Sequence, residues 1–397
     1  MKKIIILISI LLFVENTYSQ LSEGNNNVTL NGYVKYMNTI MDLPDGMNAL
    51  LGQPKGGWVN ESMFHNRLNF RWHLSNSLTF AVEARNRLIY GDMVESFSGY
   101  KNMINDDFGY FDDLTNNIIE NDAYLLNTSV DRLWVNYRKG KFEAKIGRQR
   151  INWGQTYVWN PNDIFNAYSF FDFDYEEKPG SDAIRLQYFP TFTSTAELAV
   201  KVDDKERVTA AGYYRFTSWG YDFQLLGGVL NDDEYVAGAG WSGNINDAGF
   251  NGEITYIQPT GSAEDDSGIL LSSVSMNYMF DNSLYVMAEG YYNGNFKNME
   301  INRFSGFYFQ DLSVRTLSYS EFSWFAQASY PIHPLLDGTI AFMYYPDLDG
   351  YFVNPSLKYS LTDNVQLSMH SQIFRGKFGG TSKENINFLF FRFKWSF

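Results

Sequence analysis

The segment Glu384–Phe397, with the sequence ENINFLFFRFKWSF, decides the fold. Its large apolar side chains recur at every second residue: Leu389, Phe391, Phe393, Trp395 and Phe397. A period of two is typical of a β-strand, because successive side chains point to opposite faces. An edge strand this aromatic would promote aggregation of a soluble protein. The segment therefore favours a membrane β-barrel over an ordinary edge strand.

The same period runs through the stretch from Phe64 to Leu88. In the first half of this stretch, the even-numbered positions that face one side include Phe64, Leu68, Phe70, Trp72 and Leu74. The odd-numbered positions that face the other side are His65, Arg67, Asn69, Arg71 and His73. After the turn 75–77, Leu78, Phe80, Val82, Ala84 and Leu88 alternate with Thr79, Glu83, Arg85 and Arg87. In a wide barrel the apolar face meets lipid and the charged face lines a wet lumen. Periodicity alone would also fit a soluble sandwich.

Loop lengths decide between the two, because short and long connections alternate. The tight ones are Ser75–Ser77, Lys139–Lys141, Thr191–Thr193, Thr217–Gly220, Asn244–Asp247, Asp281–Ser283 and Leu361–Asn364. The long ones are Asp42–Gly57, Asp92–Ser129, Asn152–Asp182, Gln258–Ser267 and Asn295–Leu317. Transmembrane barrels show this alternation. We expect an all-β fold, an antiparallel transmembrane β-barrel of roughly 18 strands. A barrel of about 16 strands stays open, because Asn231–Glu234 and Pro346–Gly350 are ambiguous.

The first residues predict an export signal. Lys2 and Lys3 precede the apolar run Ile4–Val14, and the small residue Ser19 precedes Gln20. This run is too short to cross a bilayer as a helix, and its flanks suit a signal peptide. We expect residues 1–19 to be removed and residues 20–397 to form one domain in the outer membrane of a Gram-negative cell.

The overall composition excludes several classes of protein. The net charge of −14 argues against nucleic acid, whose phosphates need a basic surface. Cysteine is absent, so neither disulfides nor thiolate metal sites contribute. Adjacent aromatic residues fall near expected strand ends, where a membrane interface favours Tyr and Trp. These are Tyr213-Tyr214, Tyr291-Tyr292, Tyr344-Tyr345 and Trp395.

Charge is distributed unevenly along the chain. The segments Phe64–Tyr90 and Val130–Ile151 together hold eleven basic and three acidic residues, whereas Asp92–Ser129 holds eight acidic residues and one lysine. Seven basic residues share the polar parity of their strands, and we expect them to line the pore: Arg67, Arg71, Arg85, Arg87, Arg132, Arg138 and Lys145. The acidic segment is either a constriction or plug loop facing this basic wall, or a solvated outer loop.

Arg148 and Arg150 fall on the apolar parity of Ile146. Either they lie above the hydrocarbon band, or a bulge at Gly147 turns the strand. The run Ile146–Gly154 reads IGRQRINWG, and Trp159–Asp163 reads WNPND. Both resemble a motif of the alginate-export-like and related porin-like families, and the aromatic end of the chain resembles the last strand of outer-membrane barrels. The resemblance implies that Arg148, Gln149, Trp153 and Asp163 shape the pore or brace its loop.

The features together predict a passive channel for small polar or anionic solutes. Two alternatives stay open: a channel for a specific polysaccharide or apolar compound, and a non-conducting structural barrel. Expected partners are membrane lipids, lipopolysaccharide, the barrel assembly machinery and a small-molecule solute. The sequence carries no signal for the oligomeric state.

An enzyme is not expected. His65 and His73 share a lumenal parity with arginines, His333 lies between prolines, and adjacent His370 and Ser371 point to opposite faces of a strand. No arrangement for nucleophilic catalysis emerges from these residues. We expect no cofactor and no metal, because the acidic clusters at 172–177 and 264–266 lack defined ligand spacing. These clusters are predicted to be solvated outer loops.

Overall fold

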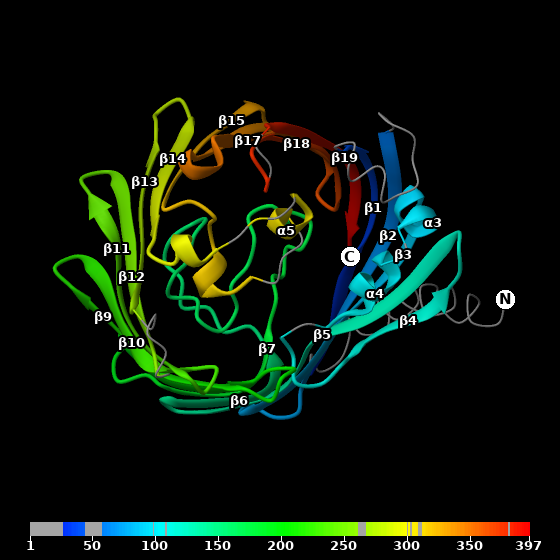
Figure 1. The fold of residues 1–397 in the computed structure, drawn as a ribbon. Coiled ribbons are helices and arrows are strands. Elements are labelled where there is room, and N and C mark those ends of the chain that lie inside the picture. Colours follow the sequence, from blue (N-terminus) through cyan, green and yellow to red (C-terminus); the bar gives the residue numbers. More distant parts are fainter. Residues whose placement is uncertain are drawn as a thin grey trace.

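The computed structural model describes residues 27–43, 58–97, 99–107, 109–260, 267–299, 301, 304–308, 312–379 and 382–397. The predicted signal peptide lies outside the described residues. The described part forms one antiparallel sheet that curves into a ring (Figure 1). Its strands are β1 (Val28–Asp42), β2 (Trp58–His73), β3 (Leu78–Gly91), β4 (Thr115–Glu120), β5 (Tyr124–Lys139), β6 (Phe142–Gln149), β7 (Ser181–Tyr188), β8 (Thr195–Val202), β9 (Val208–Ser218), β10 (Tyr221–Leu230), β11 (Glu234–Ile245), β12 (Ala248–Pro259), β13 (Ile269–Met279), β14 (Tyr285–Asn293), β15 (Phe322–His333), β16 (Leu336–Tyr345), β17 (Gly350–Thr362), β18 (Val365–Gly376) and β19 (Glu384–Ser396).

The ring closes because β1 pairs with β2 on one edge and with β19 on the other. Every strand of the ring pairs with its neighbour in the chain, except that β3 pairs with β5. The short strand β4 stands apart, since its pairing within the described sheet is with β5 alone. Of the 19 strands, β4 is therefore an addition to a closed barrel of 18. The predicted strand number is confirmed.

The outer face of the barrel is apolar. Leu198, Ile146 and Trp324 expose 60%, 55% and 55% of their surface, respectively. On β19 the predicted outward parity holds, because Phe391, Phe393 and Trp395 are all exposed. An exposed belt of this composition needs a lipid surround.

The aromatic pairs do not all belong to this outer belt. Tyr214 and Tyr344 are exposed, but Tyr291 and Tyr345 are buried on the lumenal side. The predicted position at a membrane interface therefore does not hold for Tyr291 and Tyr345. The reason is the strand period itself, since adjacent side chains point to opposite faces.

The two ends of the barrel differ as predicted. Tight turns join the strands at one end of the barrel, and both ends of the described chain lie at this end. The His73 N–H donates to the Asn27 carbonyl at 2.6 Å, and the Ser396 N–H donates to the Asn364 carbonyl at 2.9 Å. The ambiguous segments 231–233 and 346–349 are short turns at the opposite end, the second containing η3 (Pro346–Leu348). Most of the predicted loop Asp42–Gly57 lies outside the described residues.

Two long connections enter the lumen (Figure 1, green after β6 and yellow around α5). The first inner loop, residues 150–180, joins β6 to β7. The second inner loop, residues 294–321, joins β14 to β15 and contains η1 (Phe296–Asn298), α5 (Phe304–Tyr308) and η2 (Val314–Thr316). No helix in the described part of the chain is both long and apolar enough to cross a membrane.

The acidic segment between β3 and β5 contains α3 (Asp92–Ser96), α4 (Tyr100–Asn105) and β4. The helix α3 contacts β2 and β3. β6 pairs with β5 over 133–139, and β4 pairs with β5 over 125–129. β4 thus extends the wall beside β5 beyond the point where β6 has ended.

Candidate functional site in the lumen

Shortly before the first inner loop, β6 contains Gly147 in a positive-φ backbone conformation. This residue has φ of +114°, and a Cβ there would overlap the carbonyl oxygen of Leu133 on β5. Just beyond it, the Gln149 side-chain amide donates to the carbonyls of Lys145 and Ala183, each at 3.1 Å. The pairing of β6 with β5 and β7 nevertheless runs without a register shift. The predicted bulge at Gly147 is therefore not observed: β6 stays in the wall through Gln149, and the first inner loop leaves the wall at residue 150.

Replacing Gly147 with Ala is expected to destabilise the barrel by roughly 1–3 kcal/mol, because the backbone conformation is strained for an L-residue and the Cβ meets β5. Urea unfolding of the purified protein in lipid, followed by tryptophan fluorescence, measures this. Gly140 is the matched control, since it also has a positive φ of +59° but nothing lies within 4 Å of its Cβ position. Equal losses for both variants would contradict the role of the contact with β5.

Arg148 joins the end of β6 to the acidic segment. Its guanidinium donates to Asp182 Oδ1 at 2.9 Å, to Asp107 Oδ2 at 2.7 Å and to the Asp112 carbonyl. The guanidinium carbon also lies 3.9 Å from the ring centre of Tyr110. Bidentate and charge-assisted contacts of this kind suit arginine. Arg148 therefore connects the end of β6 and the start of β7 to the acidic segment.

Trp153 and Asp163 hold the next part of the loop. The Trp153 indole N–H donates to Glu197 on β8 at 2.8 Å, and the ring stacks on Tyr213 of β9 with centres 5.0 Å apart. Asp163 is buried and pairs with Arg150 at 3.2 Å. Burial raises the pKa of Asp163 to about 7, against the opposing charge of Arg150. The charge of this carboxyl group therefore changes near neutral pH.

The stretch 155–162 is held from the opposite wall by two carboxylates. Glu253 on β12 accepts the backbone N–H groups of Gln155, Thr156 and Asn162, the last two at 2.8 Å. Its exposed fraction is 0%. The amino-acid composition of the loop could not predict the contact with Glu253, because almost every residue has a backbone amide and the sequence does not show which of them bind a carboxylate.

Glu289 on β14 binds the residues between these. It accepts the backbone N–H groups of Tyr157 at 2.9 Å, Val158 at 3.1 Å and Trp159 at 2.7 Å. The Ser273 hydroxyl donates to the same carboxylate at 3.0 Å. The sequence analysis did not identify Glu253 or Glu289. Their inward parity on β12 and β14 was the only available signal.

The later part of the first inner loop crosses to β1, β2 and β19. Lys35 Nζ lies 2.8 Å from Asp174 Oδ1, and Lys394 Nζ lies 2.6 Å from Glu176 Oε2. Glu177 lies 3.3 Å from Arg67. The prediction that the cluster at 172–177 is a solvated outer loop was wrong, because these carboxylates pair with basic side chains inside the barrel. Among the described residues, no group of three or more His, Asp or Glu side chains could hold a metal ion.

The predicted pore-lining residues divide into two groups. Four are tied to protein partners. Arg67 contacts Glu83 and Asp131, and Arg85 lies 3.2 Å from Asp131. Arg87 donates to Asn127 at 2.8 Å, and Arg132 donates to the carbonyls of Glu177 and Lys178 at 2.8 and 2.7 Å. Arg67 and Arg132 thus connect the wall to the first inner loop, whereas Arg85 and Arg87 bind side chains of β5.

The other group is freer. The side chains of Arg71 and Arg138 are 49% and 63% exposed, and each has a carboxylate only at 3.8 Å. Lys145 lies 4.6 Å from the centre of the Trp134 ring. Arg215, which sequence reasoning missed, is exposed and shares the parity of lumenal Tyr213. The more exposed of these basic side chains therefore lie towards the end of the barrel with the tight turns.

Of the four histidines, two lie near the first inner loop. His65 Nδ1 lies 3.9 Å from Asp174, and the His370 ring stacks on Phe173.

Aromatic side chains pack the inner loops against β15–β19. Phe171 lies 5.0 Å from Phe352 and 5.1 Å from Phe374, and Tyr308 of α5 lies 5.1 Å from Phe388, measured between ring centres. Phe352 and Phe374 are almost fully buried. On this side of the lumen, inward-facing side chains of the wall are therefore apolar and are covered by the inner loops.

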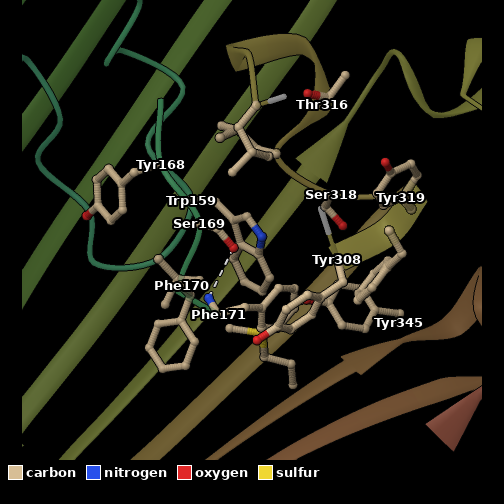
Figure 2. Close-up of a pocket in the computed structure, with 15 residues that line it drawn as sticks. Trp159, Tyr168, Ser169, Phe170, Phe171, Tyr308, Thr316, Ser318, Tyr319 and Tyr345 are labelled. Carbon is tan, nitrogen blue, oxygen red and sulfur yellow. Dashed lines mark hydrogen bonds between the residues drawn. The ribbon is translucent and has the colours of Figure 1, made fainter. Parts of the chain in front are cut away.

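The two inner loops meet at a small cavity. Figure 2 shows Trp159, Phe170 and Phe171 of the first loop opposite Tyr308, Ser318 and Tyr319 of the second. The cavity measures about 30 Å³, enough for roughly two water molecules. It is a gap in packing rather than a site for a solute.

Comparison with known proteins places the fold. No protein-family model and no curated protein matches the chain. OccK11 (OpdR) of Pseudomonas aeruginosa is similar with a TM-score of 0.56 and 11% identity, covering 93% of this chain and 96% of its own. OccAB4 of Acinetobacter baumannii is similar with a TM-score of 0.56 and 10% identity, covering 94% and 100%. The outer membrane protein OprD of Pseudomonas aeruginosa gives a TM-score of 0.56 and 11% identity, covering 93% and 94%. The chain thus has the fold of these barrels. The resemblance to alginate-export-like barrels stays a hypothesis.

Proposed function

We propose that the chain is a passive channel of the Gram-negative outer membrane that passes small polar or anionic solutes. The observation that carries this proposal is a closed barrel with an exposed apolar belt outside and accessible arginines inside. The structural likeness to OprD, whose name states that it is an outer membrane protein, supports the location. No chemistry is assigned to the protein, and lipopolysaccharide and the assembly machinery remain predicted partners.

The freer arginines would lower the electrostatic barrier for anions. Replacing Arg71, Arg138 and Arg215 together with Ser is expected to shift ion selectivity towards cations. The reversal potential across a planar bilayer with a KCl gradient measures the shift. The control removes the same charge from Arg375, Lys377 and Lys383, which lie at or beyond the outer end of β18. An unchanged reversal potential in the first variant would remove these arginines from the conducting path.

A non-conducting barrel is the second candidate, because the inner loops pack tightly against one side of the lumen. Planar-bilayer recording of the purified protein separates the two. Steady single-channel current supports the channel, and its absence supports the structural barrel. Liposome swelling with small sugars and with organic anions then ranks the solutes.

A further inference from the structure

We propose that Glu253 and Glu289 are positioning residues that hold the first inner loop across the lumen by binding its backbone. This inference rests on the proposed channel function and adds the elements that set its width. Six amides of the stretch 155–162 donate to these two side chains. Such a stretch has no strand or helix of its own, and its backbone donors need partners when buried.

The local sequence suits this contact. Pro161 has no N–H group, so it leaves no donor unpaired between the residues that bind. Gly154 packs so close to Asn160 that a Cβ would overlap its side chain, which keeps the stretch folded back on itself. Asn162 adds two contacts to the wall, donating to the Ala239 carbonyl at 3.0 Å and accepting from the Thr255 hydroxyl at 2.7 Å.

The charges of the two carboxylates and the position of the loop depend on each other. Within the described residues, neither Glu253 nor Glu289 has an ion pair with Lys, Arg or His, so N–H and O–H donors alone face these buried oxygens. If the loop moved away, two buried carboxylates would lose their hydrogen-bond donors, and if a carboxylate were removed, three backbone amides, two of them buried, would lose their acceptor. The anchored position is therefore strongly preferred.

The anchor matters for a solute because Tyr157 lies in the middle of it. Tyr157 is 39% exposed, and its hydroxyl donates to Asn277 of β13 at 2.9 Å. Glu289 holds its backbone N–H. Release of the stretch would move this exposed side chain within the lumen, and the cross-section of the path would change with it.

The test uses Glu253→Gln, Glu289→Gln and the double variant in the full chain. Glutamine keeps the shape but turns one acceptor oxygen into a donor facing backbone amides. We expect larger and noisier single-channel currents, most in the double variant. Glu143→Gln is the control, because it removes the same charge from β6, where Glu143 lies 3.8 Å from Arg138 of β5 and contacts no part of the first inner loop in the described structure. Unchanged currents in all three variants would overturn the proposal.

A second measurement works even if the barrel does not conduct. The chain has no cysteine, so Val158→Cys, at a position 3% exposed, gives a single buried thiol within the anchored stretch itself. Its maleimide labelling is expected to accelerate about tenfold when Glu289→Gln is added. Unchanged labelling would refute the anchor, whereas faster labelling without current would refute only the channel.

The effect must also depend on the loop. In a chain whose residues 152–178 are replaced by a Gly-Ser linker, the two Gln variants are expected to leave conductance unchanged. Conductance changes of equal size with and without the loop would show that the carboxylates act on the barrel itself, which would overturn the positioning role.

Discussion

Replacing residues 152–178 with a short Gly-Ser linker is expected to raise single-channel conductance several-fold. Barrels of about 16 to 18 strands are wide enough to leave an aqueous channel unless something fills them. Here the removed segment crosses the lumen, with partners on β8, β12, β14, β1 and β19. A short linker can close the gap, because Gln149 and Ser181 are directly paired across β6 and β7. Planar-bilayer recording of both chains gives the ratio.

The matched control replaces the turn 204–206 between β8 and β9 with Gly-Ser, since this turn joins adjacent strands at the outer end. Its conductance should stay that of the parent chain. If removing the first inner loop left conductance unchanged while the barrel kept its folded gel mobility, the narrowest point would lie elsewhere. The second inner loop and the acidic segment would then be the candidates.

The wall of the barrel could be predicted from the sequence because parity is a local property. Alternation in β19 and β2 assigned Phe391, Phe393 and Trp72 to the outer face, and all three are exposed. The turn lengths then gave the strand number. A charged side chain at an inward position could likewise be assigned to the lumen, as for Arg67 and Arg71.

The filling of the lumen could not be predicted in the same way. Charge pointed to Asp92–Ser129 as the loop facing the basic wall, and its role in narrowing the pore stays a prediction. The structure shows Arg148 bound to Asp107 of that segment, but it is the first inner loop that spans the lumen. Glu253 and Glu289, which anchor this loop, bind its backbone amides. The sequence therefore contains no oppositely charged side chain from which their contact with the loop could be predicted.

The aromatic packing of the inner loops against β15–β19 could not be predicted for a related reason. Phe388 and Phe390 have inward parity on β19 and are buried against Tyr308 and Phe173. Parity tells which face a side chain takes, but not whether water or another part of the chain covers that face. This depends on contacts between residues that are more than 200 positions apart along the chain, such as Gln372 with the Phe171 carbonyl.

Replacing Arg67 with Ala is expected to destabilise the barrel by about 3–5 kcal/mol, because buried carboxylates would lose the cation with which they pair. Arg67 has an exposed fraction of 0% and contacts Asp131, Glu83 at 2.9 Å and Glu177 at 3.3 Å. Urea unfolding in lipid measures the loss. Arg71→Ala is the control on the same strand, since a half-exposed arginine 3.8 Å from Glu83 should contribute less than about 1 kcal/mol.

Arg67→Lys separates charge from geometry. Lysine keeps the positive charge but cannot reach three carboxylates with a planar fork of donors, so an intermediate stability is expected. Because Glu177 belongs to the first inner loop, both Arg67 variants should also loosen that loop and raise single-channel conductance. The increase should be larger for Arg67→Ala than for Arg67→Lys. Stability losses as small as that of Arg71→Ala would show that the buried cluster does not hold the wall and the loop together. A loss of stability with unchanged conductance would instead confine the role of Arg67 to β2, β3 and β5.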